Sequence, residues 1–342
     1  MRDPMTIDAL VSPEQATGSY DVAVIGAGFS GLYATWRLKT AGHTVHSFES
    51  ADDVGDVRTW NRCPGACADS LRRAHQPSSD RGSLLNRTDP DFHLTQPEDL
   101  EYLSAFADEY DVRRHYSFNT TVAAAHWDES VSRWNFLTET GETATARYFV
   151  TGLGPASAPL GPDTSGSPDS EGEVRRTSRT PKEAIGAFTR IDIRGQCGVS
   201  LADRWNAEGP KTFLGLAVHG FPNLLLAAGP QNPFADLPPG VQAAGNWIAD
   251  YLTYAEACGF TTSHPTKQAQ EDWNDHVRKV QISRSTSHGK DAGSGAVGAN
   301  TAGKSLVCDV CRPEFKEHVD RCDAEAAADY PNMVGTRAGV MQ

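Results

Sequence analysis

The sequence lacks three features that would assign a protein to a membrane, secreted or nucleic-acid-binding class. None of its apolar runs approaches the ~20 residues needed to span a bilayer. The start of the chain lacks the basic-then-apolar order of a secretory signal, so we expect a flexible N-terminal arm over residues 1–19 and a cytoplasmic protein. Basic residues are in deficit, and the formal net charge of −13 disfavours phosphate-rich partners. We therefore expect no nucleic-acid partner and no membrane partner.

Cysteine is also scarce, with 7 residues in the chain. An odd number without a signal sequence indicates free thiols rather than a disulfide framework. Cys308, Cys311, His318 and Cys322 are ligand types that suit zinc, but their spacing only loosely matches known zinc ligand sets. Helical spacing accounts for His318 and Cys322 equally well. The sequence thus predicts ordinary cysteines and no metal site.

A P-loop pattern, G-x-x-x-x-G-K-S, occurs at residues 298–305. A working P-loop leaves a strand and opens a helix, because its phosphate-binding amides belong to that turn and to the helix N-terminus. The preceding "SHGKDAGSGA" is not strand-like, and the following "LVCDVCRPEF" has no helical period. We therefore predict that this segment does not bind ATP.

The strongest signal lies near the N-terminus. Gly26, Gly28 and Gly31 form G-x-G-x-x-G between the strand-like "DVAVIG" and the helix-like "FSGLYATWRLKTAG". In a dinucleotide-binding unit the first glycine permits the turn, the second admits a pyrophosphate, and the third lets helix and strand pack closely. The pyrophosphate rests on the helix N-terminus, where Phe29 and Ser30 stand. These five residues are predicted to bind the cofactor.

Glu49 ends the second predicted strand, "HTVHSF", about 20 residues after the glycines. A carboxylate at this place accepts hydrogen bonds from a ribose and disfavours a 2′-phosphate. FAD or NAD therefore fits this unit better than NADP.

Residues 55–75, "GDVRTWNRCPGACADSLRRAH", resemble the G-G-T-W-Y-W-N-R-Y-P-G-A-x-x-D segment of the Baeyer–Villiger monooxygenases, the class B flavoprotein monooxygenases that include cyclohexanone monooxygenase. The matching residues are Trp60, Asn61, Arg62, Pro64, Gly65, Ala66 and Asp69. Asp56, Val57, Arg58 and Thr59 depart from the pattern, so several positions that would wrap a flavin are altered. The resemblance implies FAD as the cofactor, with Trp60, Asn61 and Asp69 among its neighbours.

The resemblance continues in order to about residue 330. It implies that the backbone near Val122 meets the adenine and that Gly229 and Pro230 approach the isoalloxazine. "GANTAGK" resembles the family's G-A-N-I-P-G-K, which makes the P-loop match an accident of substitution. The implied fold is α/β, the Rossmann-type FAD-binding domain of the flavoproteins that have two dinucleotide-binding domains.

The second unit of those flavoproteins is an inserted domain that binds NADPH, and we identify no counterpart of it in this sequence. Residues 156–186 are rich in Pro, Gly and Ser, the composition of a linker. We therefore expect an FAD-binding domain in two parts, 20–155 and 187–330, joined by this linker and followed by a tail at 331–342. The family's F-x-G-x-x-x-H-x-x-x-W-P fingerprint has also lost its Phe, His and Trp, which are Ser170, Arg176 and Thr180 here.

The candidate catalytic residues are Asp69, Arg62 and His75. The resemblance makes Asp69 the partner of an active-site arginine that falls in the missing segment; Arg58, Arg62, Arg72 or Arg176 could supply that charge, and sequence does not choose among them. His75 replaces an aromatic residue near the flavin, and its imidazole could move a proton. The alternatives are a solvated or helix-capping Asp69 and a structural His75.

These observations favour an FAD-dependent, monooxygenase-like oxidoreductase that does not use NADPH in its own active site and acts on a small carbonyl-containing, biosynthetic metabolite. A separate flavin reductase, another partner protein or self-association would suit the face that the missing domain leaves uncovered. The alternatives are a non-redox isomerase or cyclase, and a binding protein that reuses the fold.

Overall fold

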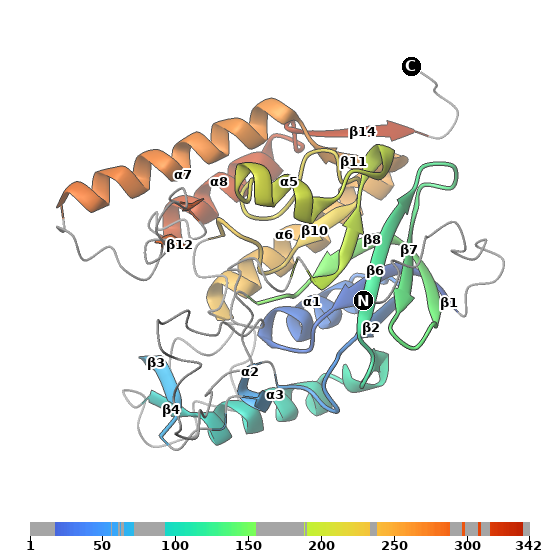
Figure 1. Cartoon of the computed structure of the whole chain (residues 1–342), viewed down its shortest axis with the longest axis vertical. Helices are drawn as coiled ribbons and strands as arrows, with labels where there is room; N and C mark the ends of the chain where they lie inside the picture. The colour runs from blue at the N-terminus through green and yellow to red at the C-terminus, as the bar shows by residue number, and fades with distance from the viewer. Residues whose placement is uncertain are drawn as a thin grey trace, which may run out of the picture.

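The computed structural model describes residues 18–55, 57–60, 62, 65–71, 93–154, 188, 190–232, 238–287, 296–297, 307–308 and 315–337. Its centre is a sheet in the order β5-β2-β1-β8-β7-β6-β9, with β10 paired to β8 (Figure 1). The parallel strands are β1 (Gly18–Ile25), β2 (Val45–Phe48), β5 (Tyr116–Ser117), β8 (Thr143–Thr151) and β10 (Leu224–Leu226). The predicted α/β fold with a parallel sheet is confirmed.

On one of its sides, the long strand β8 pairs with two different strands. Its first half pairs antiparallel with β7 (Arg133–Thr138), and its last three residues pair parallel with β10. Strand β6 (Val122–Asp128) extends the antiparallel part and pairs parallel with β9 (Asp192–Arg194). The sheet therefore brings the carboxyl ends of β1, β8 and β10 together at one edge, where open α/β sheets bind their ligands.

Alternation along β1 explains why this strand is buried on both faces. Val22 and Val24 contribute to one apolar cluster, while Ala23 and Ile25 contribute to the other. Successive side chains of a strand point to opposite faces, so an unbroken apolar run fits only between two covered layers. The "DVAVIG" segment was predicted as a buried parallel strand, and this is confirmed.

Helices α1 (Phe29–Thr40) and α6 (Pro238–Ala257) lie side by side over one face of the sheet (Figure 1). They approach closely because Gly245 of α6 lies against the ring of Tyr33; a Cβ there would be 2.6 Å from that ring. The other face is covered by α5 (Leu201–Glu208), whose Trp205 is buried in the second apolar cluster.

A third apolar cluster joins α1 to α3 (Gln96–Glu109). Thr95 and Glu98 form a capping box that fixes the start of α3: the Glu98 carboxylate accepts from the Thr95 amide at 3.0 Å. The short helix α2 (Val57–Trp60) contacts α3. Between these two helices in the chain lie β3 (Cys67–Leu71) and β4 (His93–Thr95), which pair antiparallel.

The C-terminal part contains α7 (Lys267–Ser287), α8 (Phe315–Ala327) and an antiparallel pair, β11 (Phe260–Pro265) with β14 (Met333–Arg337). Strand β14 lies within the range expected to be a tail, and β1 includes the last two residues, 18 and 19, of the expected N-terminal arm. Pairing between strands distant in sequence orders both segments. Residues 1–17, 155–187 and 338–342, which include the expected linker, lie outside the described residues.

The P-loop pattern falls between β12 (Ala296–Val297) and β13 (Val307–Cys308), which pair antiparallel. The pattern itself, residues 298–305, lies outside the described residues, so the expectation that it does not bind ATP stays a prediction. Among the described helices, none is both long and apolar enough to cross a membrane.

Candidate dinucleotide-binding site

Three glycines bring β1, β8 and α1 into backbone contact at the carboxyl edge of the sheet. Gly26 has a φ of +107°, which a residue with a Cβ rarely adopts. A Cβ on Gly31 would overlap the carbonyl oxygen of Gly26, and a Cβ on Gly152 would lie 2.7 Å from the Gly31 nitrogen. Gly26, Gly31 and Gly152, the glycine cradle, thus leave room for backbone only.

The start of α1 has the properties of an anion-binding helix terminus. Gly28 is the N-cap residue, no side chain caps the helix, and its first turn carries no acidic residue. The first hydrogen bond inside the helix runs from the Leu32 amide to the Gly28 carbonyl, 2.9 Å away. The helix dipole and the amides of this turn favour a phosphate group here.

Glu49 lies beside this turn, as predicted, but it also has a structural contact that sequence did not indicate. One oxygen of its carboxylate accepts from the Ala27 amide at 2.6 Å, and the other accepts from the Ala51 amide at 2.8 Å. The charge of Glu49 thereby holds the glycine motif against the end of β2. Charge-assisted bonds of this kind are about twice as strong as neutral ones.

Three buried hydroxyl groups form a hydrogen-bonded series that ends at the Gly26 carbonyl of the cradle. Tyr116 donates to the Gly26 carbonyl at 3.1 Å, and its hydroxyl lies 3.1 Å from that of Thr35, which in turn is 2.8 Å from that of Ser47. Burial raises the pKa of Tyr116 far above its usual range, which keeps the hydroxyl protonated as a donor. These three residues are spread over β5, α1 and β2, and no local sequence pattern marks them.

Arg58, at a position altered from the family pattern, forms a buried ion pair. Its Nε lies 2.9 Å from the Asp99 carboxylate, which is 2% exposed. Its guanidinium also lies over the ring of Phe29, 5.6 Å from the ring centre. Gln96 donates to the Arg58 carbonyl at 2.7 Å. Arg58 thus fixes α2 against both α3 and the first residue of α1.

The remaining predicted site residues are distributed as follows. Val122 is buried at the start of β6, and Gly229 and Pro230 lie in the turn that follows β10. Arg62 is exposed and donates to the Thr59 carbonyl at 2.8 Å. Trp60 lies in α2 and Asp69 in β3, but their side chains are outside the described part of the structure. Asn61 and His75 lie entirely outside the described residues.

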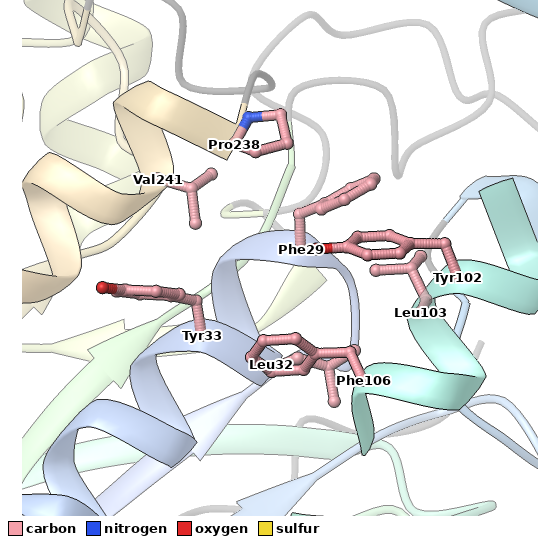
Figure 2. Close-up of a pocket in the computed structure, with 8 residues that line it drawn as sticks. All are labelled: Phe29, Leu32, Tyr33, Tyr102, Leu103, Phe106, Pro238 and Val241. Carbon is pink, nitrogen blue, oxygen red and sulfur yellow. The ribbon is translucent and has the colours of Figure 1, made fainter. Parts of the chain in front are cut away.

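An apolar pocket adjoins the start of α1 (Figure 2). Its lining comes from α1, α3 and α6: Phe29, Leu32, Tyr33, Tyr102, Leu103, Phe106, Pro238 and Val241. The Tyr33 hydroxyl points away from it and donates to Asn246 at 3.1 Å. The lining contains no carboxyl, amine or imidazole group, and its side-chain polar atoms are the hydroxyls of Tyr33 and Tyr102, so the pocket can exclude water beside Phe29.

Two of the four residues considered as zinc ligands, His318 and Cys322, are described, and packing in the core explains both. His318 and Cys322 lie one turn apart on α8, and both are buried. The His318 Nε2 lies 2.8 Å from the Leu214 carbonyl, and burial raises the pKa of Cys322 to about 12. Cys311 and the side chain of Cys308 lie outside the described residues, among which no group of three potential metal ligands occurs.

A dinucleotide cofactor fits these residues. The glycine cradle opens the backbone to close approach, the uncapped start of α1 faces the phosphate position, and Glu49 flanks it. In such a complex Gly26, Gly28, Phe29, Ser30 and Gly31 would hold the pyrophosphate.

Comparison with known proteins agrees with this site. Residues 24–84 match the family model described as an NAD(P)-binding Rossmann-like domain. A Baeyer–Villiger monooxygenase from Pseudooceanicola batsensis is 42% identical over 177 residues, 52% of this chain and 32% of the relative. An FAD-binding monooxygenase from Byssochlamys spectabilis is 36% identical over 180 residues, 52% of this chain and 30% of the relative. The matched region therefore spans about a third of the length of these curated relatives.

The fold extends the likeness further. The crystal structure of cyclohexanone monooxygenase from Rhodococcus sp. Phi1 bound to NADP+ superimposes with a TM-score of 0.81 at 20% identity, over 94% of this chain and 100% of that chain. The chain is accordingly similar to the Baeyer–Villiger and cyclohexanone monooxygenases, in sequence over about half of its residues and in fold over nearly all of them.

Proposed function

We propose that this protein is an FAD-dependent, monooxygenase-like oxidoreductase. The observation that carries the proposal is the glycine cradle at the carboxyl edge of the parallel sheet, beside an uncapped helix start and Glu49. The relatives named as FAD-binding monooxygenases support FAD over NAD. The bound cofactor would supply the redox chemistry, and the residues described here would supply its position and the exclusion of water.

We further propose that the chain does not take electrons from NADPH in its own active site. About 40 residues separate β8 from β9, whereas a domain usually needs at least 50 and an inserted dinucleotide-binding domain about 150. The stretch between β8 and β9 contains no G-x-G-x-x-G motif; apart from Gly26–Gly31, the sequence carries this pattern only at residues 293–298. Electrons would then come from the substrate itself or from a separate reductase.

The substrate class follows from the names of the relatives, which point to a small carbonyl-containing molecule. Asp69, Arg62 and His75 stay candidates for its activation. A cytoplasmic location, a role in biosynthesis and either self-association or a partner protein on the face left uncovered complete the proposal.

A second candidate function is non-redox chemistry, an isomerisation or cyclisation in the same pocket. The observation that favours it is Arg58, whose guanidinium is engaged by Asp99 where the family pattern has a flavin-wrapping residue. Activity of a flavin-free preparation equal to that of the flavin-loaded protein would establish this alternative.

The first test is the visible spectrum of the purified protein, followed by anaerobic titration with NADPH and then dithionite. We expect a bound-flavin spectrum that dithionite bleaches and NADPH leaves unchanged. Rapid bleaching by NADPH would contradict the electron-source proposal. A colourless protein that fails to take up added FAD would contradict the cofactor proposal.

A further inference from the structure

The side chain of Asn232 is buried without a hydrogen-bond partner. Asn232 is 3% exposed, and neither its amide nitrogen nor its carbonyl oxygen contacts a partner in the described structure. It is the one described side chain in which two different polar atoms are both left this way. Each buried unsatisfied polar group costs about 1–3 kcal/mol, so a side chain that carries two of them is a candidate for binding a ligand.

The adjacent residue shows that this turn can satisfy an amide when no ligand is involved. Gln231 accepts from the amide and hydroxyl of Thr212, at 3.1 and 2.9 Å. It donates to the Pro210 carbonyl at 3.0 Å and to Asn274 at 2.6 Å. Asn232, one residue further along the same turn, makes none of these contacts.

The backbone of Asn232 is tightly fixed. Gly215, with a φ of +70°, packs against it so closely that a Cβ on Gly215 would lie 2.6 Å from the Asn232 Cα. The backbone amide of Asn232 donates to the Gly229 carbonyl at 3.3 Å. The side chain therefore projects from a rigid turn, as a group that recognises a ligand should.

This turn follows β10 at the edge of the sheet where the glycine cradle lies. The Ala227 amide donates to the Thr151 carbonyl at 2.8 Å, and Thr151 precedes Gly152 of the cradle. The Thr151 hydroxyl is also fully buried without a described partner. Two residues with unsatisfied side chains thus lie close to this edge: Thr151 at the carboxyl end of β8, and Asn232 on the segment that follows β10.

We propose that the Asn232 carboxamide recognises the imide edge of the isoalloxazine ring. A carboxamide offers one donor and one acceptor side by side, and an imide offers the complementary acceptor and donor. The Asn232 Nδ2 would donate to a ring carbonyl, and its Oδ1 would accept from the ring N3–H. This assignment rests on the proposed FAD function, and it makes Asn232 a positioning and specificity residue for the flavin end of the cofactor.

The test compares Asn232→Leu with wild type in two measurements. The unfolding midpoint of the flavin-free protein should be unchanged or raised, because leucine removes the unsatisfied groups at similar volume. FAD affinity, from fluorescence titration, should fall roughly 10- to 100-fold, as expected for two lost hydrogen bonds. A residue with a purely structural role would lower both.

Asn223→Leu is the matched control. Asn223 is equally buried, at 3% exposure, but its amide donates to the Arg147 and Thr261 carbonyls and accepts from the Ser263 amide. The control should lower the stability of the flavin-free protein and leave the FAD affinity of the folded fraction unchanged.

FAD methylated at N3 supplies a second arm that needs no variant. Wild type should bind it at least tenfold more weakly than FAD, whereas Asn232→Leu should bind both equally. Equal binding of the two flavins by wild type, or unchanged FAD affinity in Asn232→Leu, would overturn the assignment while leaving FAD binding itself intact. Failure of wild type to bind FAD at all would overturn the proposed function and this assignment with it.

Discussion

The substitution Gly31→Ala tests whether the glycine cradle is a steric requirement. Gly31 lies in the first turn of α1, where alanine is favoured over glycine by about 1 kcal/mol in helix propensity. Propensity alone therefore predicts a stabilised protein. The added Cβ, however, would overlap the carbonyl oxygen of Gly26, which is backbone and cannot rotate away.

The overlap should outweigh the propensity. To restore an ordinary contact, α1 must move away from the end of β1, and overpacking of this kind costs about 1–3 kcal/mol or more. The same movement disturbs the hydrogen bond from Tyr116 to Gly26, worth about 1 kcal/mol. We expect a net loss of about 2 kcal/mol, which corresponds to a fall in Tm of about 3 °C for a chain of this length.

FAD affinity should fall by more than stability suggests, because the displaced helix start would carry the phosphate-binding amides with it. We expect at least a tenfold increase in Kd, about 1.4 kcal/mol. The assays are urea unfolding of the flavin-free protein and fluorescence titration with FAD. The control is Gly42→Ala, whose Cβ meets nothing within 4 Å and whose φ of +98° costs about 1–2 kcal/mol with no effect on FAD. A Gly31→Ala protein that is more stable than wild type and binds FAD normally would refute the steric reasoning.

Three further substitutions test contacts outside the cradle. Arg58→Met should cost about 3–5 kcal/mol in urea unfolding, because it removes a cationic partner from the buried Asp99 carboxylate; a cost below 1 kcal/mol would contradict this. Glu49→Gln should weaken FAD binding roughly tenfold, since the bond from the Ala27 amide loses its charge, and an unchanged Kd would count against the contact. Burial lowers the pKa of His318 below its usual 6.5, so the unfolded state binds a proton at a higher pH than the folded state does. The free energy of unfolding should therefore decline as the pH falls below about 6.5, and His318→Gln should remove part of that decline between pH 7 and 5. Identical slopes for the variant and wild type would contradict this contribution of His318.

Local patterns predicted the part of the site that is built from consecutive residues. The apolar run of β1, the glycines, the periodicity of α1 and the acid at the end of β2 all lie within one short stretch of chain, and each acts on its near neighbours. The same holds for α6, whose 20 residues show their helical period directly. These elements could be predicted because the interactions that form them are close in sequence.

Contacts between distant segments could not be predicted in this way. No sequence pattern indicated that Asp99 pairs with Arg58, which lies 41 residues earlier in the chain. Likewise, no pattern indicated that Tyr116 donates a hydrogen bond to the carbonyl of Gly26, 90 residues away. Strand β14 escaped prediction for the same reason, since its order comes from pairing with β11. The polar character of a residue shows in sequence, but the partner that satisfies it depends on tertiary packing.

Gly152 shows how structure changes the meaning of a departure from a family pattern. The family that the sequence resembles has alanine, in the segment A-T-G-P, where this chain has Gly152. In the structure a Cβ at this position would lie 2.7 Å from the Gly31 nitrogen and 3.2 Å from the Ile25 carbonyl oxygen. The glycine therefore lets β8 approach β1 and α1 more closely than alanine would allow. The alteration tightens the backbone around the proposed phosphate position, and the cradle that remains is a reason to expect cofactor binding in a chain whose flavin-wrapping segment has changed.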